Sequence, residues 1–299
     1  MSASIGSDIL RQDDGAWAAT WAPFTLRSAF QPIFAFEKGK LSIVAFEALL
    51  RPFRNGSPTA PLAFLGELPT TERIFVENLS HKMHLLNAAA YLPGDAEIFI
   101  NFDPSIFIDH AVAVTAIREM KATLAKISVA PQRVVCELTE RETVSEEILF
   151  ALVDSLKASG FRIAIDDFGA DESDMGRVRD LRPDIVKFDG EWVSRLMVSG
   201  PGLALLSTMV STFAEQGIRT LFEGIEEGWQ IELAEKTGVE LVQGFALARP
   251  EIVPASFVAA KPEGVSEPHF RNPPSLVLLP KTHAVGELRQ SKSFGRRTS

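Results

Sequence analysis

The 299-residue sequence has little cysteine, no long hydrophobic run and no excess of positive charge. Its single cysteine, Cys136, cannot form a disulfide within the chain, which is typical of a reducing compartment. No uninterrupted apolar stretch approaches the ~20 residues that a membrane span needs. The net charge of −9 argues against binding nucleic acid over a broad surface, because such surfaces are basic. A small phosphate compound is not excluded, since a metal ion can supply positive charge.

Several sequence motifs are also absent. The first residues, MSASIGSDILRQDDG, lack the basic segment and apolar core of a signal peptide, so we expect a cytoplasmic protein. No GxGxxG follows the first expected strand, and neither a Walker loop GxxxxGK[ST] nor a GxSxG elbow is present. A dinucleotide-binding sheet, a P-loop enzyme and an α/β-hydrolase therefore lack their main sequence support.

The histidines and the cysteine have simple interpretations. The five histidines lie on expected helices or near the C-terminus: His81, His84, His110, His269 and His283. His81 and His84 share one face of an expected helix, and without an HExxH motif around them we expect surface or partner contacts. Cys136 directly precedes Glu137 and, by strand alternation, faces the opposite way. We expect a buried structural thiol at Cys136.

Strand-like and helix-like blocks alternate from Ala29 to about Pro250. The runs FQPIFAF and LSIVAFEALL flank the turn EKGK, which predicts a β-hairpin. Later strand-like runs are separated by helical ones: EIFINFDP, QRVVCELTERE, FRIAIDDFG, DIVKFDG, RTLFEGIEE and VELVQGFALARP. About eight strands in roughly 220 residues is the size of a (β/α)₈ barrel. We predict an α/β protein with a modified (β/α)₈ TIM-like barrel and an irregular hairpin first strand; a doubly wound open sheet is the alternative.

The ends of the chain differ in composition from this alternating region. Residues 1–25 are interpreted as an N-terminal extension and residues 26–255 as the barrel. Residues 256–299 are rich in proline, serine and charge, so we expect a partly disordered C-terminal tail. No internal repeat is visible.

Each expected strand stops at a polar or charged side chain: Glu47, Asn101, Glu137, Asp166 with Asp167, Lys187, Glu223 and Gln243. The carboxyl ends of parallel barrel strands form one rim, so we expect these side chains to converge. Taken singly, each is better explained as a helix cap, an Asx turn or an exposed residue than as a ligand. Jointly they predict a bound cation, because like charges on one rim repel one another. Oxygen donors without histidine favour Mg²⁺ or Mn²⁺, and two such ions form the usual clamp for in-line displacement at phosphorus.

These blocks resemble the EAL domain family, the bacterial phosphodiesterases that open the second messenger cyclic di-GMP to linear pGpG. The resemblance covers about Ala29 to Pro250. It rests on motifs in family order: Gln31-Pro32-Ile33 before Glu47-Ala48-Leu49-Leu50-Arg51, Asn101-Phe102-Asp103-Pro104, Glu137-Leu138-Thr139-Glu140, Asp166-Asp167-Phe168-Gly169, Val186-Lys187-Phe188-Asp189, Glu223-Gly224-Ile225-Glu226 and Gln243-Gly244-Phe245.

The resemblance implies a cyclic di-GMP phosphodiesterase that uses two divalent cations, Mg²⁺ or Mn²⁺, and that forms a homodimer. The implied ligands of one metal are Glu47, Asn101, Glu137 and Asp166, with Asp166 bridging to a second metal held by Asp167 and Glu223. The implied catalytic residues are Lys187, which orients or activates the attacking water, together with Glu223 and Gln243. The implied substrate contacts are Arg51, which holds a phosphate oxygen, and Gln31 and Pro250 near the nucleotide ends. Glu226 is implied to brace the loop after Asp167.

Two positions depart from the family pattern. After Asp-Asp-Phe-Gly the family usually continues Thr/Ala-Gly-Tyr/Phe-Ser-Ser-Leu, whereas this chain reads ADESDM from Ala170 to Met175. In the family this loop couples dimer contacts to metal occupancy. Asp103 stands where the family has serine. An alternative is therefore a weakly active or inactive cyclic di-GMP receptor or protein-binding regulator, and a third reading is an unrelated metal-dependent aldolase or lyase. All implied metal ligands are present, which favours the phosphodiesterase.

Overall fold

Eight strands close into a barrel in the computed structural model, which describes residues 9–37, 39–107, 110–138, 145–170 and 175–256. The strands, in barrel order, are β3 (Phe24–Glu37), β11 (Leu241–Val242), β10 (Arg219–Phe222), β9 (Ile185–Phe188), β8 (Arg162–Phe168), β7 (Val134–Leu138), β6 (Glu97–Phe102) and β4 (Lys40–Arg54). Neighbours from β4 through β6 to β11 are parallel, and β3 is antiparallel to both β4 and β11. The predicted TIM-like barrel with an irregular hairpin at its start is confirmed.

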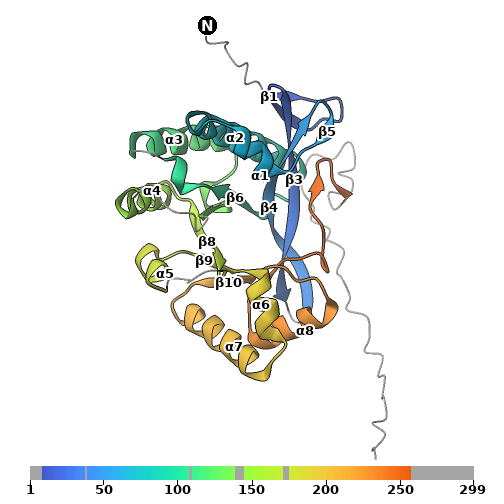
Figure 1. Ribbon diagram of the computed structural model, residues 1–299, viewed down its shortest axis with the longest axis vertical. Helices are drawn as coiled ribbons and strands as arrows, with labels where there is room; N and C mark the ends of the chain where they lie inside the picture. The colour runs from blue at the N-terminus through green and yellow to red at the C-terminus, as the bar shows by residue number, and fades with distance from the viewer. Residues whose placement is uncertain (1–8, 38, 108–109, 139–144, 171–174, 257–299) are drawn as a thin grey trace, which may run out of the picture.

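The β3–β4 hairpin replaces the helical crossover of a regular barrel. Its register runs from Phe24 opposite Arg54 to Glu37 opposite Lys40, with an irregularity between Ile33 and Phe34. Antiparallel neighbours need only a short turn, whereas each parallel pair needs a crossover connection. Figure 1 shows the result: the helices lie in an arc on one side of the strands, and the long hairpin closes the other side.

Helices connect the parallel strands and cover the outer face of the barrel (Figure 1). They are α1 (Pro61–Glu67), α2 (Thr70–Tyr91), α3 (His110–Lys126), α4 (Glu146–Ala158), α5 (Met175–Leu181), α6 (Gly190–Met197), α7 (Gly200–Glu215) and α8 (Gly228–Thr237). Ser145, Asp189 and Ser199 accept hydrogen bonds from backbone N–H groups at the starts of α4, α6 and α7. Such caps satisfy donors that the first turn of a helix leaves unpaired, so local sequence fixes where these helices begin.

Short elements that the sequence pattern did not predict complete the fold. Residues 9–21, expected within an N-terminal extension, form β1 (Ile9–Arg11) and β2 (Trp17–Trp21), and β2 pairs with the start of β3. β5 (Ser57–Pro58) pairs with β4, and β12 (Glu251–Ile252) pairs with β3. α5 and α6 are also additions, because seven and eight residues are fewer than the window over which helical periodicity is read. The expected tail from 257 onward and the loop 171–174 lie outside the described residues.

The barrel interior is built in layers. The middle layer is apolar and contains one buried residue from each strand: Ile33, Ala45, Phe99, Val135, Ala164, Ile185, Leu221 and Leu241. One step toward the amino ends of the parallel strands, Glu97 pairs with Arg162 and Arg219, and Arg219 also pairs with Glu240. Glu97, Arg162 and Arg219 come from alternate strands, as layers of a (β/α)₈ barrel do. This ion-pair layer closes the end of the barrel opposite the candidate site.

Candidate active site

The candidate site is the layer directly above the apolar one. Side chains two positions apart on a strand face the same way, so each residue two positions after an apolar layer residue points to the same interior. On the parallel strands these are Glu47, Asn101, Glu137, Asp166, Lys187, Glu223 and Gln243, and on antiparallel β3 the equivalent residue is Gln31. The predicted convergence of the polar strand ends therefore has one physical reason: all these side chains lie two residues from the apolar layer and point into the barrel.

Asp166 and Asp167 both reach the site because β8 is irregular there. Ile165 pairs with Val186 and Phe168 with Phe188, so two residues of β8 stand opposite the single Lys187 of β9. Adjacent residues of a regular strand point to opposite faces, whereas a bulge turns the extra residue aside. Asp167 has φ of 55°, in the left-handed region. One carboxylate oxygen each from Asp166, Asp167 and Glu223 consequently lie within 4.8 Å of one another.

Gly169 holds this bulge against the helix layer. Its φ is +101°, and a Cβ atom there would lie 2.5 Å from Cδ2 of Trp192. Phe168 packs at right angles to Trp192, with 6.2 Å between ring centroids. A side chain at position 169 would therefore displace the backbone of Asp166 and Asp167 from its packing position beside Trp192.

Lys187 lies at the centre of three carboxylates. Its Nζ is 2.6 Å from Glu137 Oε1 and 2.8 Å from both Asp166 Oδ1 and Glu223 Oε1. The Lys187 side chain is only 1% exposed, so its ammonium group is shielded from water. Lysine is rarely buried without partners, and here three of the predicted site residues supply them.

The electrostatics of the cluster follow from burial. Burial raises the pKa of Glu137 well above its usual value and that of Glu223 to about 8, although Lys187 opposes both shifts. Burial alone would lower the pKa of Lys187, but Asp166, Glu137 and Glu223 raise it well above its usual value. The ammonium group therefore stays charged, and Glu137 and Glu223 hold their protons more tightly than exposed carboxyl groups do.

The oxygen atoms at this rim fit divalent cations. Glu137 Oε2 and Gln243 Oε1 are buried and have no hydrogen-bond partner within the described part of the chain. Buried polar atoms are rarely left unpaired, so a bound cation or a hydrogen-bond donor is expected at these two oxygens. The predicted donors are carboxylate and amide oxygens, which suit Mg²⁺ and Mn²⁺. Glu137 is one of the predicted ligands and Gln243 is not, so the unpaired oxygen of Glu137 is the one that suits a cation near Asp166.

Gln243, Glu47 and Gln31 form the neighbouring part of the rim. Gln243 Nε2 donates a 2.7 Å hydrogen bond to Glu47 Oε2, and Gln31 pairs with Glu47 across the hairpin. Gln31 Nε2 also donates to the carbonyl of Ala248 at 3.1 Å. The register that pairs Glu251 with Phe30 places Pro250 beside Gln31. Gln31 thus ties the chain segment after Gln243 to the hairpin.

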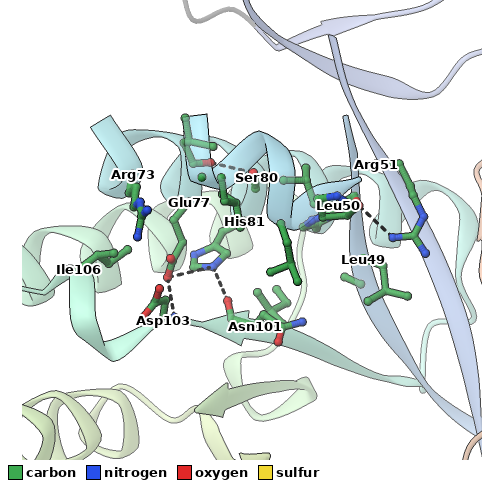
Figure 2. Close-up of a pocket in the computed structure, with 18 residues that line it drawn as sticks. Leu49, Leu50, Arg51, Arg73, Glu77, Ser80, His81, Asn101, Asp103 and Ile106 are labelled. Carbon is green, nitrogen blue, oxygen red and sulfur yellow. Dashed lines mark hydrogen bonds and ion pairs between the residues drawn. The ribbon is translucent and has the colours of Figure 1, made fainter. Parts of the chain in front are cut away.

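A cavity of about 440 Å³ adjoins the rim beside β4. Its lining comes from the end of β4, from α1 and α2, and from the end of β6 and the residues after it. Figure 2 labels the residues of β4, α2 and β6 among them. Arg51 and Asn101, two of the predicted site residues, both line the cavity. Asp103, the departure from the family pattern, also lines the cavity; its side chain accepts a hydrogen bond from Ser105 N at 3.0 Å and caps the short 3₁₀ helix Pro104–Ile106.

The interpretation of two histidines was wrong, and that of the cysteine is confirmed. His81 and His84 are each 4% exposed rather than on the surface, because α2 packs against β2, β3, β6 and α3. His81 Nε2 lies 2.9 Å from the carbonyl oxygen of Asn101, and His84 Nδ1 lies 2.9 Å from Ser28 Oγ. Cys136 is fully buried on the outer face of β7, opposite Glu137.

The loop after Glu223 is held by a residue that sequence reasoning missed. Gln230 Oε1 accepts hydrogen bonds from the backbone N–H groups of Glu226 and Glu227, both at 2.8 Å, and Gln230 Nε2 donates to Ser194 Oγ at 2.9 Å. The spacing Glu227-x-x-Gln230 is a capping-box pattern that could have identified it. Glu226 is exposed, and its predicted partner loop, 171–174, lies outside the described residues.

The fold and site define an α/β-barrel protein with an acidic, oxygen-rich rim. Residues 24–250 match the family described as "EAL domain", and the chain belongs to that family. It is 29% identical over 226 residues to the blue light- and temperature-regulated antirepressor BluF of Escherichia coli K12, covering 75% of this chain and 54% of BluF. It is 27% identical over 228 residues to the probable cyclic di-GMP phosphodiesterase PdeG of the same organism, covering 74% of this chain and 44% of PdeG. The chain thus spans about half of these curated relatives.

Solved structures share the fold. Klebsiella pneumoniae BlrP1, in a manganese and cyclic di-GMP complex, aligns with a TM-score of 0.68 at 25% identity, over 82% of this chain and 59% of BlrP1. A standalone EAL protein from Vibrio cholerae O395, in its cyclic di-GMP-bound form, aligns with a TM-score of 0.66 over 77% of this chain and 97% of its own. At 22% identity, this second likeness shows the fold alone. No described helix is long and apolar enough to cross a membrane.

Proposed function

We propose that this protein hydrolyses cyclic di-GMP to linear pGpG at the barrel rim, with two divalent cations, Mg²⁺ or Mn²⁺. The observation that carries the proposal is the cluster of Glu137, Asp166 and Glu223 around Lys187, with Asp167 turned into the same site. The relative named as a probable cyclic di-GMP phosphodiesterase and the manganese complex of BlrP1 support the substrate and the metal. The catalytic unit is proposed to be residues 26–255, acting as a homodimer.

Two groups of rim residues would each bind one metal ion. Glu47, Asn101, Glu137 and Asp166 would hold one ion, and Asp166, Asp167 and Glu223 the other. When bound, such ions neutralise the negative charge that builds up during displacement at phosphorus. Gln243 holds Glu47 through its amide nitrogen, so its part is to fix a ligand in place and to line the pocket.

Lys187 would orient the attacking water by a hydrogen bond that takes the place of one of its three carboxylate contacts. Its raised pKa keeps the ammonium protonated, so Lys187 acts as a donor and not as the base. The proton released by the water would pass to a nearby carboxylate, and Glu223, 2.8 Å from Lys187 Nζ, is the candidate.

The cavity beside β4 would hold one base of the nucleotide. Its volume of about 440 Å³ lies within the ~300–1,000 Å³ of small-molecule sites. Leu49, Leu65 and Val76 contribute apolar walls, and Arg51 brings a guanidinium that can bind a phosphate oxygen in a planar, two-point manner. Gln31 and Pro250 would border the other end of the ligand.

The direct test is to incubate the purified protein with cyclic di-GMP and either metal and to measure pGpG by chromatography. We expect product with Mg²⁺ or Mn²⁺, no product with EDTA, and no product from Glu47→Ala. Glu235→Ala, an exposed acid on α8, is the matched control and should retain full activity. Undiminished activity of Glu47→Ala would contradict the metal assignment.

The second candidate is a regulator that binds cyclic di-GMP without cleaving it. It is supported by the 29% identity to a relative named as an antirepressor. Binding of cyclic di-GMP without product, at high protein concentration and with either metal, would favour this function and rule out the phosphodiesterase.

A further inference from the structure

The end of β6 has a strand neighbour on one side only at the point where Asn101 lies. On the β7 side the ladder continues through Asn101 opposite Glu137 to Phe102 opposite Leu138. On the β4 side it stops with Ala48 opposite Ile100. The backbone remains extended as far as Asp103, which has φ of −89° and ψ of 102°.

Two side chains of α2 occupy the place of the missing neighbour. In an extended strand, the C=O of one residue and the N–H two residues later point to the same side, and a parallel neighbour binds both. Here His81 Nε2 lies 2.9 Å from the carbonyl oxygen of Asn101, and the backbone N–H of Asp103 donates to Glu77 Oε1 at 3.3 Å. Glu77 and His81 are four residues apart, so they lie on one face of the helix. Figure 2 shows both pointing from α2 toward Asn101 and Asp103.

We propose that His81 and Glu77 are positioning residues that hold the Asn101 backbone as an adjacent strand would, and thereby place the Asn101 amide for metal binding. The proposal rests on the proposed function, in which Asn101 is a metal ligand. It gives a role to His81 and Glu77 that neither the strand-end pattern nor the motif of Asn101 to Pro104 contains.

Packing and hydrogen bonds fix the positions of His81 and of the backbone segment that it contacts. His81 is 4% exposed, and its ring stacks on Phe102 with 4.5 Å between centroids and 30° between planes. Because a carbonyl oxygen only accepts hydrogen bonds, His81 Nε2 carries a proton and donates a hydrogen bond to the carbonyl of Asn101. The far side of the segment is fixed by Asp103, which accepts from Ser105 N.

Loss of a hydrogen bond that orients a metal ligand weakens metal binding, because the ligand is then less well placed. Mutations of residues that orient metal ligands typically cost about 10–100-fold in metal affinity. His81→Leu removes the donor but keeps an apolar side chain, whereas His81→Gln keeps a nitrogen donor close to the position of Nε2. Glu77→Gln likewise keeps an oxygen acceptor for the Asp103 N–H, and Glu77→Leu does not.

The test is the Mn²⁺ dissociation constant of the full chain without nucleotide, measured by electron paramagnetic resonance of free Mn²⁺. We expect His81→Leu to weaken binding about tenfold and His81→Gln to recover most of that loss. Asn87→Leu is the matched control: Asn87 is a fully buried polar residue of the same helix, bonded to Trp17 and Ser28. It should lower the melting temperature and leave Mn²⁺ binding unchanged.

The outcomes separate this proposal from the proposed function. If Asn101→Ala leaves Mn²⁺ affinity unchanged, the metal assignment of Asn101 is wrong. If Asn101→Ala weakens binding while His81→Leu binds like wild type, or if Asn87→Leu weakens it as much as His81→Leu, the positioning role is overturned. Should His81→Leu fail to fold, Glu77→Leu against Glu77→Gln decides, and equal affinities of that pair would overturn the proposal.

Discussion

Replacing Lys187 by methionine tests whether its ammonium group holds the site carboxylates together. In the wild type, Nζ lies within 2.8 Å of oxygens from Glu137, Asp166 and Glu223, with the side chain 1% exposed. Methionine keeps a flexible chain of similar length but leaves the carboxylates facing one another. Removing one partner of a buried ion pair costs about 3–5 kcal/mol. For a domain of this size, each kcal/mol lowers the melting temperature by about 2–4 °C, so we expect a loss of roughly 6–20 °C.

The pH dependence of this loss separates charge from packing. The folded-state pKa of Glu223, about 8, lies above its ordinary value of 4.5, so the folded protein holds a proton that the unfolded chain releases. Such a group favours the folded state below pH 4.5, and that stability is lost as the pH rises through about 8. Without Lys187 the repulsion among ionised acids is larger. The free-energy deficit of Lys187→Met in EDTA should therefore be smallest near about pH 5.5 and largest near about pH 8.5.

The assay is urea-induced unfolding followed by circular dichroism, at both pH values, with EDTA or with Mn²⁺. Mn²⁺ should restore part of the stability of Lys187→Met, because it supplies the missing positive charge. Val186→Ala, a buried neighbour on the outer face of β9, is the control and should show a deficit that depends on neither pH nor metal. A Lys187→Met deficit that behaves like that of Val186→Ala would refute the electrostatic reasoning.

Three further predictions test other parts of the barrel. Asp167→Asn should weaken Mn²⁺ binding at least about tenfold by calorimetry, and unchanged affinity would remove Asp167 from the metal site. Arg219→Ala breaks ion pairs at the opposite end of the barrel, so it should lower the melting temperature while leaving the rate of pGpG formation as in wild type. Gly169→Ala should reduce both stability and Mn²⁺ affinity, because the added Cβ meets Trp192. Gly217, with φ of +74° and open space around it, is the control, and Gly217→Ala should reduce stability only. Equal Mn²⁺ affinities in the two variants would contradict the role of Gly169 at the bulge.

The alternation of the sequence predicted both the barrel and most of the site. Parallel strands place their carboxyl ends on one rim, and period-two alternation fixes which side chains point inward. Glu137 and Cys136 illustrate this, since adjacent positions on one strand were assigned to opposite faces and are found there. These relations are local, so they can be read without knowing what packs on the strand.

The sequence could not assign the faces of α2. His81 and His84 have the spacing of a shared helical face, and a histidine pair on an expected helix suits an exposed surface as well as a buried one. The exposure of a helix face depends on its neighbours, and here β2, β3, β6 and α3 cover α2 from several sides. Gln230 is a mixed case: its hydrogen bonds to Glu226 and Glu227 are local capping contacts, whereas its contact to Ser194 is set by how α6 and α8 approach each other.

Asp166 and Asp167 show which features of the site the local sequence could not predict. The sequence by itself determined that two acids follow a buried strand at the rim where the other polar strand ends meet. Strand alternation alone would point Asp166 and Asp167 to opposite faces. Only the tertiary structure decided that both carboxylates lie together with that of Glu223, because the pairing of β8 with β9 is unequal and the backbone of Asp167 is left-handed. That backbone geometry is set by contacts of Phe168 and Gly169 with the neighbouring strand and helix, which lie far away in sequence.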